Sequence, residues 1–543
     1  MKLKELIDGI ENLICINPST LERYYEHSIS LITQSFKCLK QTNEQNDNGL
    51  MFIMPTLNEI NGTEIILDHS TINILLNSSL SALVVNDCLL INLLELAIFP
   101  VFKVLKIITT TNIIFGQLCN RYYNYPRRLI HQMIGVTGTN GKTTTTHMIE
   151  KVLLDAKLTV GLIGTLGYRY HSDENNINDY INTDYTTPNA WLLQTILNDM
   201  TNKYHIENIV IEVSSHSLIL DRINGCDFTV GILTNFTQDH LNFHQTMENY
   251  LQSKLLLFSK YLSKSSSSIA IINHDDPSYE YFINICSKNT KIYTYGLLKK
   301  NQNSFLASNI KYSLNGINYI ITIPSGETRH VHLNIFGEYN VYNSLACIAT
   351  CLTTYSHLLT LDQIIQSLEK FETVKGRFEF IICCKPFSVV VDYAHTSDAL
   401  ERTMKNGRQW LVEFNKNSRL IIVFGCGGNK DQLKRPLMGH VAEENADIII
   451  ITSDNPRQEN PQSIIDDILS GIQQKIDNNR LYIELDREKA IHLAMNLAKN
   501  RNDLIIIAGK GHESTQILAD HSIQFSDQEV VKNKYKQMMQ NNL

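Results

Sequence analysis

The 543-residue sequence has no excess of basic residues, since 48 lysine and arginine residues stand against 55 aspartate and glutamate residues and the formal net charge is -7. It therefore lacks the basic footprint on which nucleic-acid binding depends, and we expect no nucleic-acid partner. Its 11 cysteines include no CxxC pair and are scattered along the chain. This pattern is typical of reduced thiols, so we expect a cytoplasmic protein without a disulfide framework.

Nor does the sequence contain an uncharged apolar run long enough to span a membrane. The most apolar stretch, residues 89–108, contains Glu95, Pro100, Lys103 and Lys106. It predicts a buried helix followed by a strand rather than a transmembrane helix. The first residues, MKLKELIDGIENLI, mix charged and apolar side chains and lack the apolar core of a signal peptide. We expect no membrane partner.

The sequence does contain an alternation of strand and helix patterns after a polar stretch, residues 120–128, that has the composition of a linker. Short apolar runs separated by helical patterns predict parallel strands joined by crossover helices. We expect strands at 133–138, 208–213, 229–234 and 269–272, helices at 189–204 and 247–262, and a hairpin around the Asn315-Gly316 turn.

From about Lys375 the same rhythm returns in the runs SVVVDYAH, RLIIVFGCGG, ADIIIITSDNP, RLYIEL and DLIIIAGKGHE. A doubly wound sheet would bring the segments that follow these strands to one edge, where ligands bind in such folds. The length suggests several domains. We expect an α/β protein with a small α/β domain at 1–126, a central P-loop ATPase-like parallel sheet domain at 127–374 and a C-terminal Rossmann-like doubly wound domain at 375–543.

The stretch GVTGTNGKT, residues 135–143, has the spacing of a phosphate-binding loop between a strand and a helix. Glycines allow successive backbone N–H groups to turn toward phosphate oxygens, and the following helix adds the positive end of its dipole. Lys142 is expected to reach the outer phosphates and Thr143 to ligate magnesium. The predicted nucleotide-binding residues here are Gly138, Thr139, Asn140, Gly141, Lys142, Thr143 and Thr144.

Two further strand ends contain side chains that can hold a metal ion. Glu212 follows the run NIVI, and Asp239, His240 and His244 lie in the segment TQDHLNFH. Any one of these could be an ordinary polar residue of a surface loop. Their positions after buried strands favour Glu212 and His240 as ligands.

The motifs GVTGTNGKTTTT, TTP, EVSSH, TNFTQDHLNFH, NVYN, GRFE, DYAH, GCGGNKD, DNPR and GKGHE occur in the order found in the Mur ligases. From Met133 onward the chain resembles the members that add the third residue of the peptidoglycan stem peptide. The resemblance implies a monomeric cytoplasmic ligase in which ATP phosphorylates the terminal carboxylate of UDP-N-acetylmuramoyl-L-alanyl-D-glutamate. The amine of the third amino acid then attacks the acyl phosphate. Phosphate leaves far more readily than oxide, so positioning and electrostatics are the protein's expected contributions.

The resemblance also implies roles for individual residues. Lys142, His240 and Lys254 would be catalytic, and a carbamylated Lys254 would hold Mg²⁺, at two sites, together with Thr143, Glu212 and His240. Further nucleotide contacts are implied for Asn340, Arg377, Asp392 and His395, and contacts with the UDP substrate for Thr33, Ser35, Thr186, Thr187, Ser214 and Arg222. Without the resemblance, Lys254 would be read as an exposed helical lysine and the others as caps and turn residues.

The motif DNPR bears on which amino acid is added. The resemblance implies meso-diaminopimelate, which differs from lysine by a carboxylate at its far end. The guanidinium of Arg457 can pair bidentately with that carboxylate, which lysine lacks. The implied diaminopimelate site comprises Lys430, Asp454, Asn455, Pro456, Arg457, Gly509 and Glu513. By itself, DNPR would be read as a turn before a helix.

Several positions depart from the family pattern. Lys430 stands where the diaminopimelate-adding type usually has arginine, Leu220 replaces a polar side chain, and Gln34-Ser35-Phe36 replaces Asp-Ser-Arg. Three alternatives stay open: the same reaction with L-lysine, a folylpolyglutamate synthase, and a degenerate paralogue that binds nucleotide without catalysis. DNPR, TTP and the additional leading domain argue against the synthase. The intact residues Lys142, Glu212, His240 and Lys254 argue against the paralogue.

Overall fold

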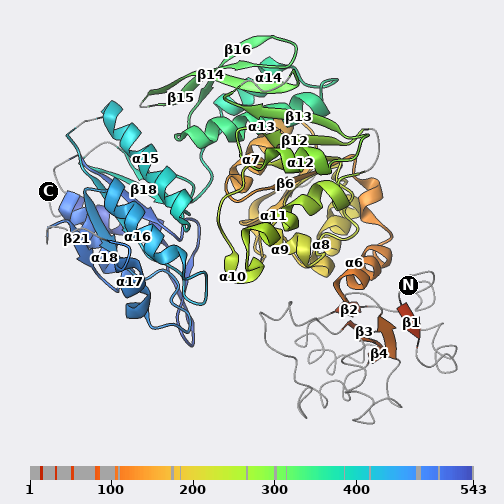
Figure 1. Ribbon diagram of the computed structural model, residues 1–543, viewed down its shortest axis with the longest axis horizontal. Helices are drawn as coiled ribbons and strands as arrows, with labels where there is room; N and C mark the ends of the chain where they lie inside the picture. Colours follow the sequence, from red (N-terminus) through yellow and green to blue (C-terminus); the bar gives the residue numbers. More distant parts are fainter. Residues whose placement is uncertain are drawn as a thin grey trace. The chain divides into compact units, whose positions relative to one another are not determined.

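The computed structural model describes residues 111–543 except for 173–175, 184, 264–266, 299–301, 314, 384–385, 415–416, 473–478, 499–501 and 541–543. Before residue 111 it describes five strands, β1 (Leu13–Cys15), β2 (Leu31–Thr33), β3 (Leu50–Ile53), β4 (Leu80–Val85) and β5 (Val104–Ile107) (Figure 1). Their sheet has the order β1-β5-β4-β3-β2, with only β1 antiparallel to its neighbour. Strand β5 ends the apolar stretch 89–108, as predicted, and the helix expected before it lies outside the described residues.

The chain forms two compact units. Unit 1 comprises Met1–Gly135, Leu158–Val230 and Leu256–Ser268, and unit 2 comprises Val136–Lys157, Gly231–Leu255 and Ile269–Leu543. The chain passes from one unit to the other within the predicted strands β6 (Gln132–Thr137) and β11 (Val230–Leu233).

Unit 1 contains β7 (Val160–Gly164), which pairs in parallel with β10 (Asn208–Glu212) and antiparallel with β8 (Gly167–His171), followed by β9 (Asn176–Ile181). The predicted helix 189–204 consists of α8 (Ala190–Asn198) and a π-helical turn, Asp199–Lys203. The linker prediction for residues 120–128 was wrong. Helix α6 (Thr111–Tyr122) extends into it, because the rings of Tyr122 and Tyr123 pack 5.5 and 5.2 Å from that of Trp191.

Unit 2 contains the helix α7 (Lys142–Asp155) and the helix α11 (Met247–Leu256) up to Leu255. It also contains the strands β12 (Ile269–Asn273), β13 (Lys291–Gly296) and β14 (Ser304–Ser313), which pair in parallel. Strand β14 turns back into β15 (Gly316–Thr322) and then β16 (Thr328–Leu333), both antiparallel. This confirms the hairpin predicted at Asn315-Gly316. Helices α13 (Glu338–Thr354) and α14 (Leu361–Glu369) follow.

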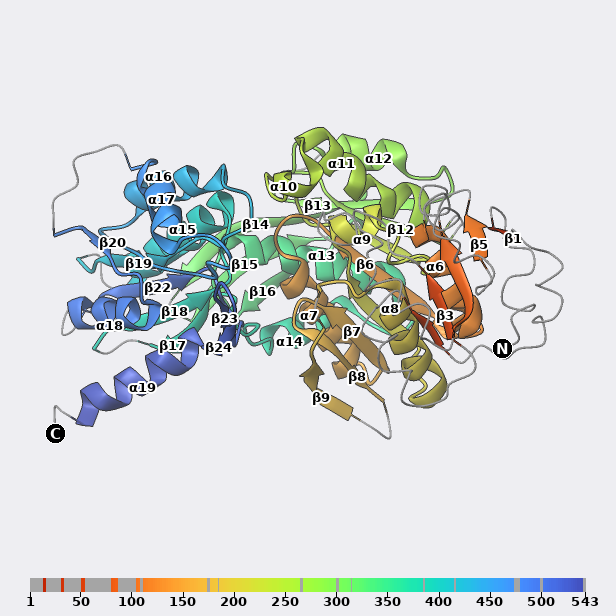
Figure 2. The same ribbon diagram turned by 90° about the horizontal axis from the view of Figure 1, so that it is seen from below.

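The C-terminal part of unit 2 is a second sheet with the order β17-β18-β22-β19-β20-β21 (Figure 2). Its strands are β17 (Glu379–Ile382), β18 (Ser388–Asp392), β19 (Leu420–Phe424), β20 (Ile448–Ile451), β21 (Leu481–Ile483) and β22 (Leu504–Ala508). All pairs are parallel except β17–β18, in which the edge strand β17 was not predicted. The five predicted strands are confirmed.

Helices cover both faces of this sheet. Alternate residues of the strands pack on one face against α15 (Ser397–Phe414), α16 (Lys434–Asn445) and α17 (Pro461–Leu469), and on the other against α18 (Arg487–Ala498) and α19 (Asp527–Gln540). Because both faces are buried, runs such as IIII need no polar alternation. The doubly wound prediction is confirmed, and the carboxyl ends of β18, β19, β20 and β22 meet at one edge.

Candidate active site

The predicted phosphate-binding loop connects β6 to α7. Gly138 and Gly141 have φ angles of +145° and +85°, which residues with a Cβ rarely adopt. Lys142 is the first residue of α7, and its Nζ donates hydrogen bonds of 2.9 Å to the carbonyl oxygens of Gly138 and Thr139. The loop thus curls around an ammonium group at a helix N-terminus, an arrangement that attracts phosphate oxygens.

Residues that follow β11 hold the loop in this shape. Asn235 accepts a hydrogen bond of 2.9 Å from the backbone N–H of Asn140 and donates one of 3.0 Å to its carbonyl oxygen. Thr234 Oγ1 donates to the same carbonyl at 2.6 Å. Thr139 Oγ1 donates to Thr237 O at 3.0 Å. The motif TNFT therefore shapes the loop through contacts within the protein.

Lys254 is buried beside this loop, with 1% of its surface exposed. Its Nζ donates a hydrogen bond of 2.8 Å to Gly138 O and lies 4.5 Å from the ring centroid of Tyr250. Burial, and then the positive charge of Lys142, lower the pKa of Lys254 well below the value of an exposed lysine. The reading of Lys254 as an exposed helical lysine is therefore wrong.

Asp239 lies next to two imidazoles, one from the adjacent residue His240 and one from His395 in a distant segment. Its Oδ2 is 3.3 Å from His240 Nε2 and 3.9 Å from His395 Nε2. Burial acts to raise the pKa of Asp239, but the charges of His240, His395 and Lys434 outweigh burial and hold that pKa below its usual range. The carboxylate is therefore ionised at neutral pH. The approach of His395 could not be read from the sequence.

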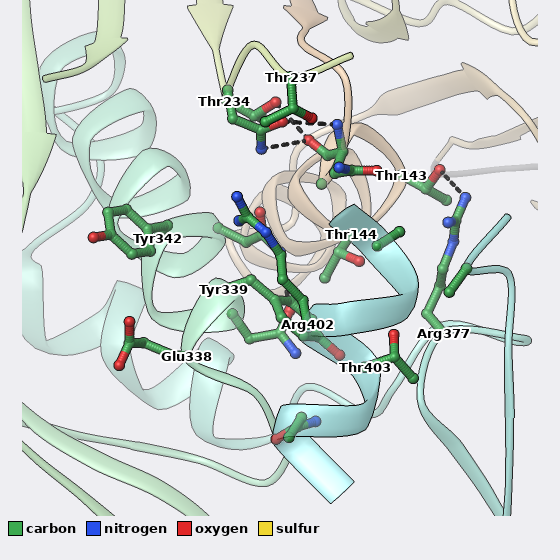
Figure 3. A pocket seen from close by; sticks show the side chains of 18 of the residues that line it. Thr143, Thr144, Thr234, Thr237, Glu338, Tyr339, Tyr342, Arg377, Arg402 and Thr403 are labelled. Atoms are coloured by element: carbon green, nitrogen blue, oxygen red, sulfur yellow. Dashed lines mark hydrogen bonds between the residues drawn. The ribbon is translucent and has the colours of Figure 1, made fainter. Parts of the chain in front are cut away.

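A cavity of about 620 Å³ opens beside the phosphate loop (Figure 3). This volume lies within the range of pockets that hold small-molecule ligands. Eight of the predicted nucleotide-binding residues line it: Asn140, Gly141, Thr143, Thr144, Asn340, Arg377, Asp392 and His395. In the described part of the chain, Gly138, Thr139 and Lys142 do not line it, since Lys142 is bonded back to the loop.

Other lining residues were missed by sequence reasoning. Asn273 ends β12 and donates to Thr234 O at 2.8 Å. Its place at the carboxyl end of a buried strand was a usable signal. Tyr339, Tyr342 and Arg402 come from helices α13 and α15 (Figure 3), and only the tertiary fold brings them to this wall.

Arg377 and Asp392 organise the part of the wall that belongs to the segment 376–395. Arg377 Nη2 donates a hydrogen bond of 3.0 Å to Thr143 Oγ1, and its guanidinium carbon lies 4.7 Å from the ring centroid of Tyr393 (Figure 3). Asp392 accepts a hydrogen bond of 2.6 Å from the backbone N–H of Phe378. Burial raises the pKa of Asp392, and the positive charge of Arg377 offsets part of this rise. Asp392 therefore braces the GRFE segment against the end of β18.

The segments DNPR and GKGHE meet at the carboxyl edge of the C-terminal sheet. Asn455 Nδ2 donates to Glu513 Oε2 at 2.8 Å, and Lys510 Nζ donates to Asn455 Oδ1 at 3.0 Å and to Glu513 Oε2 at 2.8 Å. Lys510 is fully buried and was not singled out from the sequence. Gly509 has φ +113°, and a Cβ there would lie 2.5 Å from Asp454 Oδ2. The two segments are therefore in close contact.

Arg457 lies on the same edge, beside the glycine turn that follows β19. Its Nη1 donates to Gly428 O at 3.0 Å. A Cβ on Gly427 would lie 3.0 Å from Arg457 Nη1 and 3.6 Å from Lys430 Cγ, so the two cationic side chains flank one turn. The fold brings together all residues of the predicted diaminopimelate site: Lys430, Asp454, Asn455, Pro456, Arg457, Gly509 and Glu513.

Unit 1 gathers most of the residues predicted to contact the UDP substrate. Thr187 Oγ1 donates to Glu212 O at 2.7 Å and accepts from Ser214 N at 3.1 Å. Arg222 Nη1 donates to Thr187 O at 3.4 Å, and Thr186 Oγ1 lies 3.2 Å from Thr165 Oγ1. The Glu212 carboxylate accepts hydrogen bonds from Thr165 N at 2.9 Å and Thr165 Oγ1 at 3.0 Å.

Two predicted contacts lie near the start of the chain. Thr33 is the last residue of β2, and its side chain is outside the described part of the structure. Ser35 also lies outside the described residues. Among the described residues, no helix is long and apolar enough to cross a membrane, and no three His, Cys, Asp or Glu side chains group in a way that could hold a metal ion.

Comparison with protein families accounts for this set of motifs. Residues 136–351 match the Mur ligase middle domain, and residues 376–511 match the Mur ligase glutamate ligase domain. The chain belongs to the Mur ligase family. The resemblance seen in the sequence is thereby confirmed.

Similar Mur ligases include a UDP-N-acetylmuramoyl-L-alanyl-D-glutamate--2,6-diaminopimelate ligase of Clostridium acetobutylicum, 43% identical over 419 residues that span 77% of this chain and 80% of the relative. The ligase of the same name from Geobacillus thermodenitrificans is 39% identical over 77% of this chain and 82% of its own. A solved structure of such a ligase aligns with a TM-score of 0.61 at 27% identity, covering 99% of both chains.

The structural likeness extends to a rival considered from the sequence. Mycobacterium tuberculosis folylpolyglutamate synthase, solved with ADP and AMPPCP, aligns with a TM-score of 0.57 at 14% identity, covering 74% of this chain and 92% of the synthase. At this identity the likeness shows a shared fold.

Proposed function

We propose that this Mur ligase joins meso-diaminopimelate to UDP-N-acetylmuramoyl-L-alanyl-D-glutamate with hydrolysis of ATP, in peptidoglycan precursor synthesis. The observation that carries the proposal is the single sheet edge where Arg457 and Lys430 flank one turn and Asp454 and Glu513 lie next to it. Such an edge offers cations to the substrate's carboxylates and carboxylates to its ammonium groups. The relatives that carry the diaminopimelate name support the same choice.

The cavity beside the phosphate loop is proposed to bind ATP. Its volume of about 620 Å³ fits a nucleotide, and its walls supply backbone N–H groups, hydroxyls and the Arg377 guanidinium. Lys142 is bonded to two loop carbonyls, an arrangement that phosphate oxygens would replace with stronger, charge-assisted hydrogen bonds. Mg²⁺ would neutralise charge that develops on the phosphate oxygens during transfer.

We propose that Lys254 acts as a carbamate. Carbamylation requires the neutral amine, and burial beside Lys142 favours that form by lowering the pKa of Lys254. The modification would replace two neighbouring cations by an ion pair and would supply the oxygen ligands that Mg²⁺ prefers. The other proposed Mg²⁺ ligands are Thr143, His240 and Glu212.

Further parts of the proposal concern the chain as a whole. The residues at 186–187, 214 and 222, with Thr33 and Ser35, are proposed to bind the UDP substrate. We also propose domain limits at residues 126 and 374, a monomeric state and a cytoplasmic location. L-Lysine as the amino acid is the second candidate, because Lys430 lacks the planar fork with which arginine binds a carboxylate.

Phosphate release by the purified protein tests the proposal. We expect release only when ATP, UDP-N-acetylmuramoyl-L-alanyl-D-glutamate and an amino acid are all present, together with a product whose mass is that of the tripeptide. A nucleotide-binding paralogue without catalysis would release no phosphate. A folylpolyglutamate synthase would require a folate instead of the UDP substrate.

A further inference from the structure

A buried ion pair lies behind the edge where DNPR and GKGHE meet. Arg487, at the start of α18, binds Asp527, at the start of α19, through two hydrogen bonds of 2.8 Å, from Nε to Oδ1 and from Nη2 to Oδ2. Both side chains are 0% exposed. The pair fixes the plane of the guanidinium completely, since both carboxylate oxygens are engaged.

The same guanidinium reaches the backbone at the base of both recognition segments. Arg487 Nη2 donates to Ala508 O at 3.0 Å, and Nη1 donates to Ser453 O at 3.4 Å. Ala508 directly precedes Gly509, and Ser453 directly precedes Asp454. One side chain therefore contacts the last peptide before each segment.

The strand order explains why such a contact is needed. In the sheet, β22 and β20 are not neighbours, because β19 lies between them. No backbone ladder directly joins the strand that leads into GKGHE to the strand that leads into DNPR. The side chains of Asn455, Lys510 and Glu513 join the two segments directly, and Arg487 links the backbone at the base of each.

The energetics also favour a role beyond stability. Removing a charged pair from water costs free energy that its mutual attraction barely offsets. A buried ion pair therefore adds little to the free energy of unfolding. Asp527 and α19 also lie beyond residue 511, where the match to the family's glutamate ligase domain ends. Their role is thus read from the geometry of this chain.

We propose that Arg487, locked by Asp527, is a positioning residue for the amino-acid substrate. It holds Asp454 and Gly509 at the separation that the substrate requires, without touching the substrate. The inference rests on the proposed function, because it assigns the two segments to the amino-acid site. Lysine cannot replace arginine here, since one ammonium nitrogen cannot present the planar fork that spans both carbonyls and both carboxylate oxygens.

The test compares Arg487→Lys with a matched control, Arg419→Lys. Arg419 also donates two guanidinium hydrogen bonds to a buried carboxylate, from Nε and Nη2 to the single oxygen Asp503 Oδ2 at 3.0 and 2.6 Å. Those residues precede β19 and β22, at the opposite edge of the same sheet. KM values for diaminopimelate and ATP are measured for each full-length variant, together with thermal melting.

We expect Arg487→Lys to raise the KM for diaminopimelate about tenfold or more and to leave the KM for ATP within about twofold. Arg419→Lys should change neither KM, although its melting temperature falls by a similar amount. If Arg487→Lys does not fold, Asp527→Asn takes its place, because asparagine keeps one oxygen acceptor for Arg487 and only loosens the fork.

An unchanged KM for diaminopimelate, or equal rises in both KM values, would overturn the positioning role. So would a matching rise in the Arg419→Lys control. Failure of the proposed function has a different signature, since the unmodified protein would then form no tripeptide with diaminopimelate.

Discussion

Lys254 Nζ donates a hydrogen bond of 2.8 Å to the carbonyl oxygen of Gly138, so this lysine of α11 contacts the phosphate loop directly. Lys142 donates to the same carbonyl at 2.9 Å. Two lysines that share one acceptor in a buried site cannot both stay protonated without cost. Burial, and then the charge of Lys142, lower the pKa of Lys254, and the neutral amine that this favours is the form that the proposed carbamylation requires.

The first prediction concerns this lysine. Lys254→Ala should abolish tripeptide formation, and excess bicarbonate should not restore it, because no amine remains to be carbamylated. In protein equilibrated with ¹³C-bicarbonate, NMR should show a carbamate signal that is absent from the variant. Lys151→Ala is the matched control, since Lys151 is a helical lysine paired with Asp155 on the surface. An active Lys254→Ala protein would show that tripeptide formation does not need a carbamate at this position.

The second prediction concerns Arg457. Arg457→Ala should raise the KM for diaminopimelate about 100-fold, because the far carboxylate loses a bidentate partner. The KM for ATP should change little. Arg408→Ala is the control, since Arg408 pairs with Asp447 elsewhere in the same sheet domain. Steady-state kinetics with each substrate varied in turn decide the point, and equal changes in both KM values would refute the assignment.

The third prediction uses the contact between Gly509 and Asp454. In Gly509→Ala, the methyl group would lie 2.5 Å from Asp454 Oδ2, so the Asp454 carboxylate must leave its position in the proposed amino-acid site and tripeptide formation should be lost. Gly326→Ala has a similar backbone problem, with φ +86°, but nothing lies within 4 Å of its Cβ. Both variants should lose about 1–2 kcal/mol of stability from backbone strain.

Only Gly509→Ala should lose activity. If Gly326→Ala loses as much activity, the effect comes from general destabilisation, and the two segments do not need their close contact.

The fourth prediction concerns pH. Burial, and then the positive charge of unmodified Lys254, lower the pKa of His244 to about 4 in the protein without the carbamate. Between about pH 6.5 and about pH 4 the unfolded chain binds a proton at this imidazole that the folded chain does not, so stability should fall as pH falls through this window. Urea unfolding at pH 7.5 and pH 5 should show a loss on the order of 1–2 kcal/mol that His244→Asn lacks. Parallel losses in both proteins would contradict this explanation.

Much of the site could be predicted from sequence because parallel strands impose a simple rule. Residues after buried strands reach one edge, and this rule placed DYAH, GCGGNK, DNPR and GKGHE together correctly. It also applied to Asn273, the last residue of β12, which the sequence reasoning missed.

Other features depend on contacts between distant segments. Arg402 lies in a helix without a motif, Tyr339 directly precedes the motif NVYN, and the contact of Lys510 with Asn455 joins residues 55 positions apart. The polar composition of residues 120–128 suggested a linker, whereas packing of Tyr122 and Tyr123 on Trp191 extends helix α6 into that segment. Periodicity and composition contain no information about such pairings.

The most direct measurement of the central claim is the kcat/KM of the purified protein for meso-diaminopimelate and for L-lysine, with ATP and UDP-N-acetylmuramoyl-L-alanyl-D-glutamate saturating. We expect a preference for diaminopimelate of about 100-fold or more, because lysine leaves the cationic side chains of Arg457 and Lys430 without a carboxylate partner. Equal values for the two amino acids, or a preference for lysine, would contradict the assignment of the DNPR edge as a carboxylate-binding site.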